Sequence, residues 1–328
     1  MKNKRLSFFN IAALYIGTIM GAGFASGREA WQFFGVFGLQ GYVGIALSGF
    51  LFMALGMMVA YIARVTDTDD MGKIILYSDN PRITNGIGYF MAAILYMVII
   101  SMSAAGGSFL HQQFGLHKAV GGGIIAVLVI LTVLGNFDRI SRIFRWIVPV
   151  LLFVDLALCA VVIFSDIEQS GQTSGFPVSA MASNWFIAAF LFISYNMLGM
   201  IPIVGEASIK AKSGRQAVIG AGLGGFLLTV LTLVLVTALR QDMAFTQSMD
   251  LPMLAYSARI SVPANILFGA VLFFAIYSAA TSTYYGFTTK IKEGPKKKYI
   301  VVIGACVGFV CGLSGFKTLV AYLYPAEG

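Results

Sequence analysis

The feature that most constrains the fold of this chain is a glycine-rich interruption near the middle of its first apolar stretch. Residues 6–37 are apolar enough to enter a bilayer, yet the segment Gly21-Ala22-Gly23-Phe24-Ala25-Ser26-Gly27 divides them about halfway along. A backbone N–H or C=O group without a hydrogen-bond partner costs several kcal/mol in hydrocarbon. An unwound segment at this depth is therefore expected only where it lines a ligand site or a water-filled cavity.

A second interruption with the same glycine spacing lies in the middle of the sequence. The segment Gly199-Met200-Ile201-Pro202-Ile203-Val204-Gly205 divides another membrane-length stretch, and its outer glycines are as far apart as Gly21 and Gly27. A carboxylate stands just beyond each interruption, Glu29 after the first and Glu206 after the second. Interrupted helices in corresponding places of two halves of a chain are typical of a transporter's binding site.

The composition restricts the chain to the class of polytopic membrane proteins. Of its 328 residues, 58% are hydrophobic and only 11% are charged, and the mean hydropathy is +0.85. Apolar stretches of about 20 residues mark membrane-spanning helices. We predict nine spans, at residues 6–37, 41–63, 83–111, 119–136, 142–165, 183–209, 214–239, 262–288 and 299–323.

The basic residues indicate how the chain is oriented. With the N-terminus inside, most Lys and Arg residues fall in cytoplasmic segments, as the positive-inside rule requires. The net charge of +8 therefore reports topology and contact with anionic membrane lipid, and a nucleic-acid partner is not expected. The expected location is the bacterial inner (plasma) membrane, crossed many times, with a cytoplasmic N-terminus.

The two interruptions divide a single transmembrane domain, residues 1–328, into two repeats. Five predicted spans fill the first repeat, at about 6–165, and an odd number of spans reverses the direction in which the next one begins. The second repeat, at about 183–324, is therefore predicted to be an inverted copy, related by a pseudo-two-fold axis in the membrane plane. It contains only four predicted spans, so a tenth helix is expected to be absent.

The residues at the interruptions resemble a known family. The segment GAGFASG-R-E followed by W-Q-F-F-G, the segment YNMLGMIPIVGE and the five-plus-five arrangement are similar to the YkvI-type bacterial membrane proteins. These are relatives of the amino acid/polyamine/organocation (APC) superfamily of transporters, which share the LeuT-type inverted-repeat fold. The resemblance implies an all-α secondary transporter whose helices 1 and 6 unwind around a small substrate, often an amino acid. It also implies that transport is coupled to sodium or protons. The absent tenth span is a departure from the pattern of the family.

The first interruption is the leading candidate for binding the substrate. Glycine lets the backbone approach a ligand closely, and the N–H groups at the start of a helix attract negative charge. We therefore expect a carboxylate or another strongly polar substrate group to bind at Gly21, Ala22, Gly23, Ala25 and Ser26. The alternative is that these small residues only permit close helix packing.

Further candidates come from polar and aromatic side chains. Polar groups are costly at bilayer depth unless they are satisfied, so those just before the second interruption are expected to face the cavity. They are Ser194, Tyr195 and Asn196, followed by Gly199 at the interruption itself. Phe192 is a candidate for closing over the substrate, and Tyr96 for touching it from the third span. For both aromatic residues the alternative is ordinary core packing.

The sequence leaves two alternatives for the coupling ion. Oxygens three and four residues apart on one helix face can converge on a hard cation, and the eighth span offers such a set. Here the carbonyl of Ser278 and the hydroxyls of Thr281 and Ser282 can converge. The resemblance implies a sodium site made by two hydroxyls on this helix and by helix 1 carbonyls that map onto Gly17 and Met20. The alternative role of these hydroxyls is hydrogen bonding to their own helix.

Asp155 in the fifth span is the corresponding candidate for proton coupling. A carboxylate inside a membrane is costly when charged and marks a functional site by default, although a protonated, hydrogen-bonded packing residue is the alternative. Three charged residues just past the interruptions, Arg28, Glu29 and Glu206, are gate candidates that either pair or extend toward the surface.

The predicted function is secondary active transport of a small polar or zwitterionic solute, with an amino acid favoured, by alternating access. An enzyme is not expected, because the chain has two histidines and lacks the HExxH, phosphate-loop and GxSxG motifs. A sodium ion is the one bound cofactor considered. An ion or solute channel and a non-transporting membrane sensor are the alternatives, and the substrate, the transport direction and the oligomeric state are left open.

Overall fold

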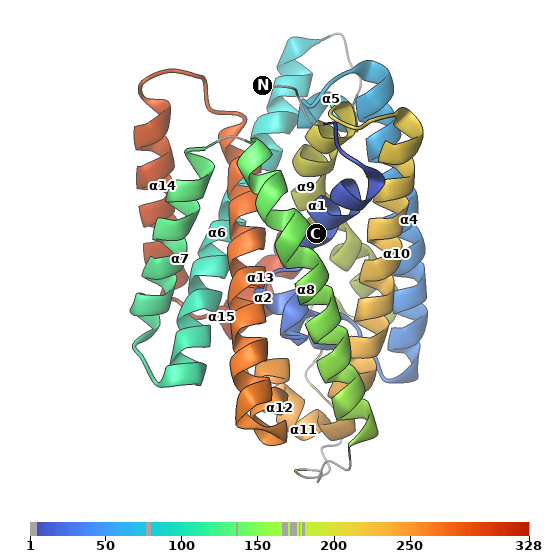
Figure 1. The fold of residues 1–328 in the computed structure, drawn as a ribbon, viewed down its shortest axis with the longest axis vertical. Helices are drawn as coiled ribbons and strands as arrows, with labels where there is room; N and C mark the ends of the chain where they lie inside the picture. Colours follow the sequence, from blue (N-terminus) through green and yellow to red (C-terminus); the bar gives the residue numbers. More distant parts are fainter. Residues whose placement is uncertain are drawn as a thin grey trace.

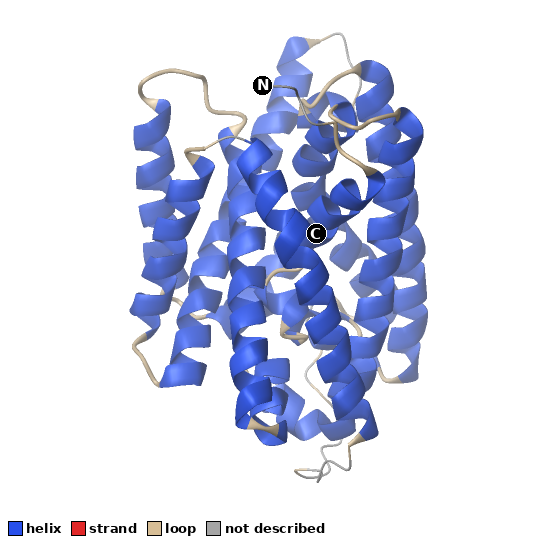
Figure 2. Ribbon diagram, viewed as in Figure 1, coloured by secondary structure: helices blue, strands red, loops and turns tan. Residues whose placement is uncertain are grey.

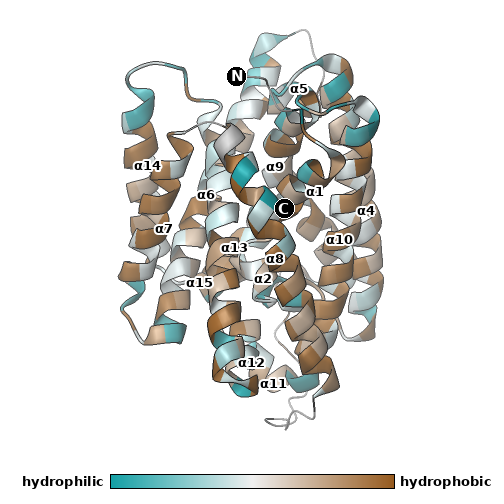
Figure 3. Cartoon of the chain, in the orientation of Figure 1, coloured by the Kyte–Doolittle hydropathy of each residue, from teal (hydrophilic) through white to brown (hydrophobic). Residues whose placement is uncertain are grey.

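The computed structural model describes residues 5–76, 80–135, 137–165, 170, 176, 178 and 181–327. Within these residues the regular structure is helical, apart from one isolated bridge between Leu6 and Ala211. Figure 2 shows a bundle of long helices that run roughly along one axis. Hydrophobic residues predominate along the middle of the bundle, while hydrophilic ones gather near its two ends (Figure 3).

The elements of the first half follow one another in the order shown in Figure 1. They are α1 (Phe8–Ile19), α2 (Ala22–Ala25), α3 (Arg28–Phe33), η1 (Gly35–Phe37), α4 (Leu39–Thr66), α5 (Met71–Ile75), α6 (Pro81–Phe114), α7 (Lys118–Val133) and α8 (Phe137–Phe164).

The second half begins at Trp185. It contains α9 (Trp185–Ile209), α10 (Gly214–Leu239), η2 (Arg240–Asp242), α11 (Met243–Ser248), α12 (Pro252–Ile260), α13 (Val262–Thr288), α14 (Lys297–Gly312) and α15 (Phe316–Glu327). In Figure 1, α11 and α12 lie at the end of the bundle opposite the N-terminus. That end is the outer side in the predicted orientation.

Six helices among the described residues are long and apolar enough to cross a membrane, or seven if α14 and α15 form one bent span. The helices α1 and α7 are apolar but shorter. The chain is therefore a multi-pass, all-α membrane protein, as predicted. Each predicted span falls on helix, but the count of nine full-length spans is not confirmed, and the inverted relation between residues 6–165 and 183–324 stays a prediction.

The first interruption divides its helix as the sequence predicts. Helix α1 ends at Ile19, and Met20 follows with a non-helical ψ of 69°. A single turn, α2, comes next, and Gly27 then separates it from α3 with a φ of 78°. Because this left-handed conformation favours glycine, Gly27 fixes the corner at which the chain turns into α3.

Residues 199–205 do not interrupt their helix, so the prediction of a second unwound segment is wrong. Helix α9 continues from Trp185 to Ile209, with Pro202 inside it. A proline removes one hydrogen bond from a helix, which bends or weakens it without unwinding a whole turn. A Cβ atom at Gly205 would lie 2.7 Å from Cδ1 of Ile74, so this glycine makes room for α5. Close helix packing is therefore the role of Gly205 in this structure.

The ninth predicted span is wrong in its second half. Residues 299–323 do not form one helix, because α14 ends at Gly312 and α15 starts at Phe316 after a bend of 113°. Gly315, between them, has a φ of 104°, which a glycine adopts readily. Helix α15 turns back into the protein and packs against α9, α6 and α3. A further helix thus follows the ninth span, where none was expected.

Candidate functional site

A small cavity lies at the centre of the bundle, beside the break between α1 and α2. Its volume is about 40 Å³, and its wall is built from α1, α3, α6, α9, α13, α15 and the α1–α2 junction. Four predicted substrate residues belong to this wall: Gly21, Tyr195, Asn196 and Gly199. The structure therefore brings the first interruption and the polar part of α9 together around one cavity, which is the central expectation from the sequence.

Glu29 occupies the side of this cavity that was assigned to the substrate. Its carboxylate folds back over α2, since a Cβ atom at Gly23 would lie 2.0 Å from Oε1 of Glu29. The hydroxyl of Tyr195 donates a hydrogen bond to Oε2 of Glu29, and the Glu29 side chain is almost fully buried. Gly23 thus makes room for Glu29, and the gate candidate Glu29 lines the cavity itself.

An aromatic cluster holds Tyr195 in place. Its ring lies 5.8 Å from that of Phe192 and 5.2 Å from that of Tyr324, measured between centroids. Phe192 is fully buried and also packs on Phe24, Phe34 and Phe52. It is absent from the cavity wall among the described residues, so core packing describes Phe192, and its effect on the site is to orient Tyr195.

The other residues of the first interruption are buried outside the cavity wall. Ala22 and Ala25 form α2, and Ser26 lies at the corner between α2 and α3. The carbonyl of Ser26 accepts a hydrogen bond from the backbone N–H of Met253 at 2.9 Å. The hydroxyl of Ser26 accepts one from the backbone N–H of Arg28 at 3.4 Å. Ser26 therefore ties the corner to α12 in this structure.

Two further candidates also lie away from the cavity. Ser194 is half-buried on α9 and does not line it. The hydroxyl of Tyr96 donates to the carbonyl of Gly304 at 2.9 Å, which joins α6 to α14. In place of Tyr96, α6 contributes Val98 and Met102 to the wall.

The cavity also contains residues that the sequence analysis missed. Thr18 and Thr283 line it from α1 and α13 with their hydroxyls bonded to their own helices, and Tyr324 and Glu327 reach the wall from α15. The signal for α15 was present as Gly312-Leu313-Ser314-Gly315, a turn-forming sequence within the ninth apolar stretch. Nothing in the sequence, however, shows that the following helix reaches the centre.

The predicted sodium ligands on α13 differ in how their hydroxyls are used. The hydroxyl of Ser278 donates to the carbonyl of Ala275, and that of Ser282 to the carbonyls of Ser278 and Ala279, all at 3.0–3.1 Å. The hydroxyl of Ser282 thus follows the alternative of bonding to its own helix, and the carbonyl of Ser278, which is the ligand expected from that residue, accepts this bond. Thr281 is fully buried, and its hydroxyl has no hydrogen-bond partner within the described chain.

The two predicted ligands on α1 lie near its end. Met20 is fully buried directly after the last residue of the helix. A Cβ atom at Gly17 would lie 2.7 Å from side-chain atoms of Phe144 and Val148, so Gly17 allows α8 to approach α1 closely. Of the whole predicted set, Thr281 is thus the residue with a buried hydroxyl free to bind a cation.

Asp155 is a fully buried carboxylate on α8. Neither of its oxygens has a hydrogen-bond partner among the described residues. A charged carboxylate in this environment would be strongly disfavoured, so Asp155 must be protonated or must meet a cation. Both the proton-coupling role and the packing alternative for Asp155 stay predictions.

Arg28 closes the α11/α12 side of the site. Its Nη1 donates to the carbonyls of Gln247 and Met249 at 3.3 and 3.4 Å. The indole of Trp31 donates to the side-chain oxygen of Gln247 at 2.6 Å, and Lys317 at the start of α15 donates to the Gln247 carbonyl at 3.1 Å. These contacts hold α3 and α15 against the segment that contains α11 and α12.

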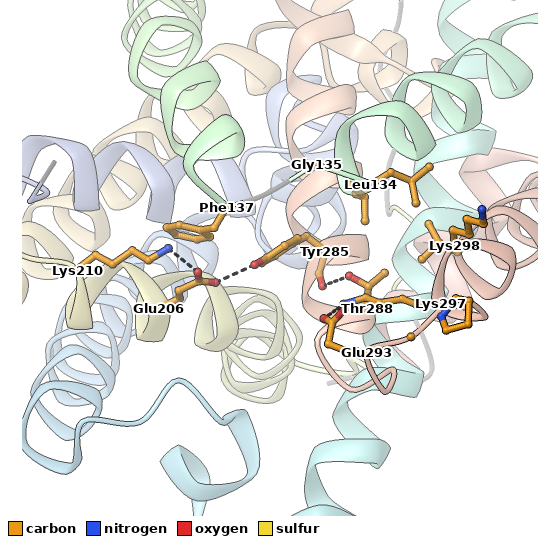
Figure 4. Close-up of a pocket in the computed structure, with 14 residues that line it drawn as sticks. Leu134, Gly135, Phe137, Glu206, Lys210, Tyr285, Thr288, Glu293, Lys297 and Lys298 are labelled. Carbon is orange, nitrogen blue, oxygen red and sulfur yellow. Dashed lines mark hydrogen bonds and ion pairs between the residues drawn. The ribbon is translucent and has the colours of Figure 1, made fainter. Parts of the chain in front are cut away.

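Glu206 lies on the opposite side, in the wall of a larger cavity of about 540 Å³. Figure 4 shows its carboxylate between Lys210 and Tyr285, which donate to it at 2.8 and 3.2 Å. Since Tyr285 is on α13, the Glu206–Tyr285 bond connects α9 to α13 at the N-terminal side of the bundle. The amine of Lys210 also lies 4.4 Å from the centre of the Phe137 ring on α8.

Comparison with known sequences gives relatives without an assigned activity. No family model matches the chain. It is 24% identical to the uncharacterized membrane protein YkvI of Bacillus subtilis (strain 168), over 100% of this chain and 94% of that protein. It is also 24% identical to the uncharacterized protein YyaD of the same organism, over 96% and 91% of the two chains. The predicted resemblance to YkvI-type proteins is confirmed.

Comparison with solved structures confirms the predicted LeuT-type fold. A Na⁺-coupled sialic acid symporter matches with a TM-score of 0.68 and 12% identity, over 98% of this chain and 75% of the other. Mhp1, a nucleobase-cation-symport-1 family transporter with bromovinylhydantoin bound, matches with 0.63 and 14%, over 97% and 75%. A manganese transporter of Eremococcus coleocola matches with 0.61 and 13%, over 98% and 76%.

Proposed function

We propose that this protein is a secondary active transporter of a small polar or zwitterionic solute, with an amino acid as the favoured class. The observation that carries the proposal is the central cavity at the break of helix 1, where backbone from the α1–α2 junction meets Tyr195 and Asn196 of α9. An interrupted helix at a cavity is the arrangement in which transporters bind their substrates. The structural neighbours, which are symporters and other transporters, support the same class of function.

The contacts on the two sides of the cavity fit the roles of gates in alternating access. Arg28 joins α3 to the carbonyls of Gln247 and Met249 on one side, and Glu206 joins α9 to Tyr285 of α13 on the other. Access from either side requires that one of these sets of contacts opens. The cavity of about 540 Å³ beside Glu206 lies toward the N-terminal side, which is cytoplasmic in the predicted orientation.

Coupling to an ion belongs to the same proposal. The orphaned hydroxyl of Thr281 supports a sodium site between α13 and the end of α1, and the unpartnered Asp155 supports a proton site on α8. Both features are buried polar groups that lack a hydrogen bond among the described residues, which is unusual in a folded protein. The inner membrane is the proposed location.

The test is uptake of radiolabelled amino acids into liposomes that contain the purified protein. We expect saturable uptake that an imposed sodium or proton gradient drives above the equilibrium level. Replacing sodium with choline would abolish uptake coupled through Thr281, whereas collapsing the pH gradient would abolish uptake coupled through Asp155. Non-saturating flux with ionic conductance would instead indicate a channel, and substrate binding without any flux would indicate a sensor; either result would overturn the proposal.

A further inference from the structure

Helix α15 brings two residues from the far end of the chain into the central cavity. After the bend at Gly315, the helix packs against α9, α6 and α3. Tyr324 packs its ring on Tyr195, and Tyr324 and Glu327 both line the cavity. The site is therefore incomplete without α15.

The cavity contains two buried carboxylates that come from opposite ends of the sequence. The Glu29 residue is 3% exposed and the Glu327 residue 9% exposed. One oxygen of Glu29 accepts the hydrogen bond from Tyr195. The Oε1 atom of Glu327 is buried and has no hydrogen-bond partner in the part of the chain that the structure describes.

No positive charge compensates these carboxylates within the described wall of the cavity. The titratable residues of the wall are Glu29 from α3, Tyr195 from α9, and Tyr324 and Glu327 from α15, while α1, α6 and α13 contribute none. Arg28 follows Gly27 in the sequence, but its guanidinium points away to the Gln247 and Met249 carbonyls. Two uncompensated carboxylates in a buried site are strongly unfavourable unless a cation or protons neutralise them.

We propose that Glu29 and Glu327 together bind the positively charged group of the transported solute, an alkylammonium in chemical class. This rests on the proposed transport function and adds the charge that the substrate must carry. The Tyr195 hydroxyl positions the Glu29 carboxylate, and α15 supplies the opposing carboxylate. A volume of about 40 Å³ holds little more than an ammonium head group, so the cavity must widen to admit the rest of a larger solute.

The experiment measures binding to the purified full chain by thermal unfolding, followed through tryptophan fluorescence. Three probes of similar size differ in charge: propylammonium chloride, 1-propanol and potassium propionate, each titrated at constant ionic strength in potassium chloride. A ligand that binds only the folded state raises the Tm in a saturable way. We expect a saturable rise with propylammonium and none with the other two probes. An equal rise with 1-propanol, or no rise with propylammonium, would overturn the inference.

Matched variants locate the effect. Glu29→Gln and Glu327→Gln keep the shape of the side chain but remove its charge, and each is expected to abolish the rise with propylammonium. Glu293→Gln is the control, because the Glu293 side chain is 85% exposed and does not line the central cavity. This variant should respond like the unmodified protein. Without a probe, Glu327→Gln should be at least as stable as the unmodified protein, since it replaces a buried carboxyl group that has to be neutralised by a neutral amide. A full propylammonium response in Glu327→Gln would contradict the proposed site.

The outcome separates this inference from the proposed function. If propylammonium binds through the two glutamates but no solute crosses the liposome membrane, the cation site stands and the transport function fails. If uptake of a neutral or anionic solute is saturable and propylammonium does not compete with it, the transport function stands and the cation site fails.

Discussion

The two glycine-bounded segments, residues 21–27 and 199–205, have the same glycine spacing but different structures. The first follows a break in the helix at Met20 and ends at a second break at Gly27. The second is part of a continuous helix. In the first, Gly27 adopts a left-handed conformation and Gly23 leaves space that Glu29 fills. In the second, Gly205 leaves space for Ile74, and the helix needs no break to provide it. Glycine spacing alone therefore does not predict unwinding.

The strongest test of this difference is a glycine replacement at the corner of the first segment. In Gly27→Ala the new Cβ would lie 2.7 Å from Cδ1 of Leu239, in a backbone conformation that disfavours side chains. We expect the free energy of unfolding to fall by about 2–4 kcal/mol, measured by denaturant titration in detergent. The matched control is Gly199→Ala, whose Cβ would meet Thr283 at an ordinary 3.5 Å inside a helix. Equal losses in the two variants would contradict the distinction.

A replacement at Gly23 tests whether the first segment is shaped around Glu29. The Cβ of Gly23→Ala would overlap the Glu29 carboxylate, so the side chain must leave its position. We expect a loss of about 1–3 kcal/mol in unfolding free energy and loss of the propylammonium response in thermal unfolding. Gly205→Ala is the counterpart in the second segment, where the contacted atom is the flexible end of Ile74. It should keep the response; if Gly23→Ala keeps it too, Glu29 is not held in place by this glycine.

The contribution of α9 to the site is tested at Tyr195. Tyr195→Phe removes the hydroxyl that donates to Glu29 and keeps the aromatic packing on Phe192 and Tyr324. We expect the free energy of unfolding to fall by about 1–2 kcal/mol because a buried carboxylate loses its donor. Tyr96→Phe on α6 is a matched control, since the Tyr96 hydroxyl donates to a carbonyl of α14 outside the cavity. It should leave solute binding unchanged, whereas Tyr195→Phe should weaken it.

The smallest effect is expected at the proline of the second segment. Pro202→Ala adds a backbone N–H to a helix that is already continuous, so the variant can complete one more hydrogen bond. We expect stability to change by less than about 1 kcal/mol, with unchanged helix content by circular dichroism. A large loss of binding in this variant would show that α9 depends on the proline to form the site, as the original prediction of an unwound segment requires.

The sequence by itself determined the all-α membrane class and the break in helix 1. These are local properties, because hydrocarbon requires each apolar stretch to satisfy its own backbone by forming a helix, and because a left-handed corner favours glycine at position 27. The sequence also identified Tyr195, Asn196 and Glu29 as polar groups that must find partners at bilayer depth.

Only the tertiary structure decided which of these groups meet. The contact between Gly205 of α9 and Ile74 of α5, and the presence of Glu327 in the cavity after the 113° bend before α15, are both set by how the helices pack. Contacts of this kind join helices that are far apart in the sequence, so no local pattern specifies them. The physical reason is that hydropathy fixes whether a segment is a helix, while side-chain packing between helices fixes which polar faces converge.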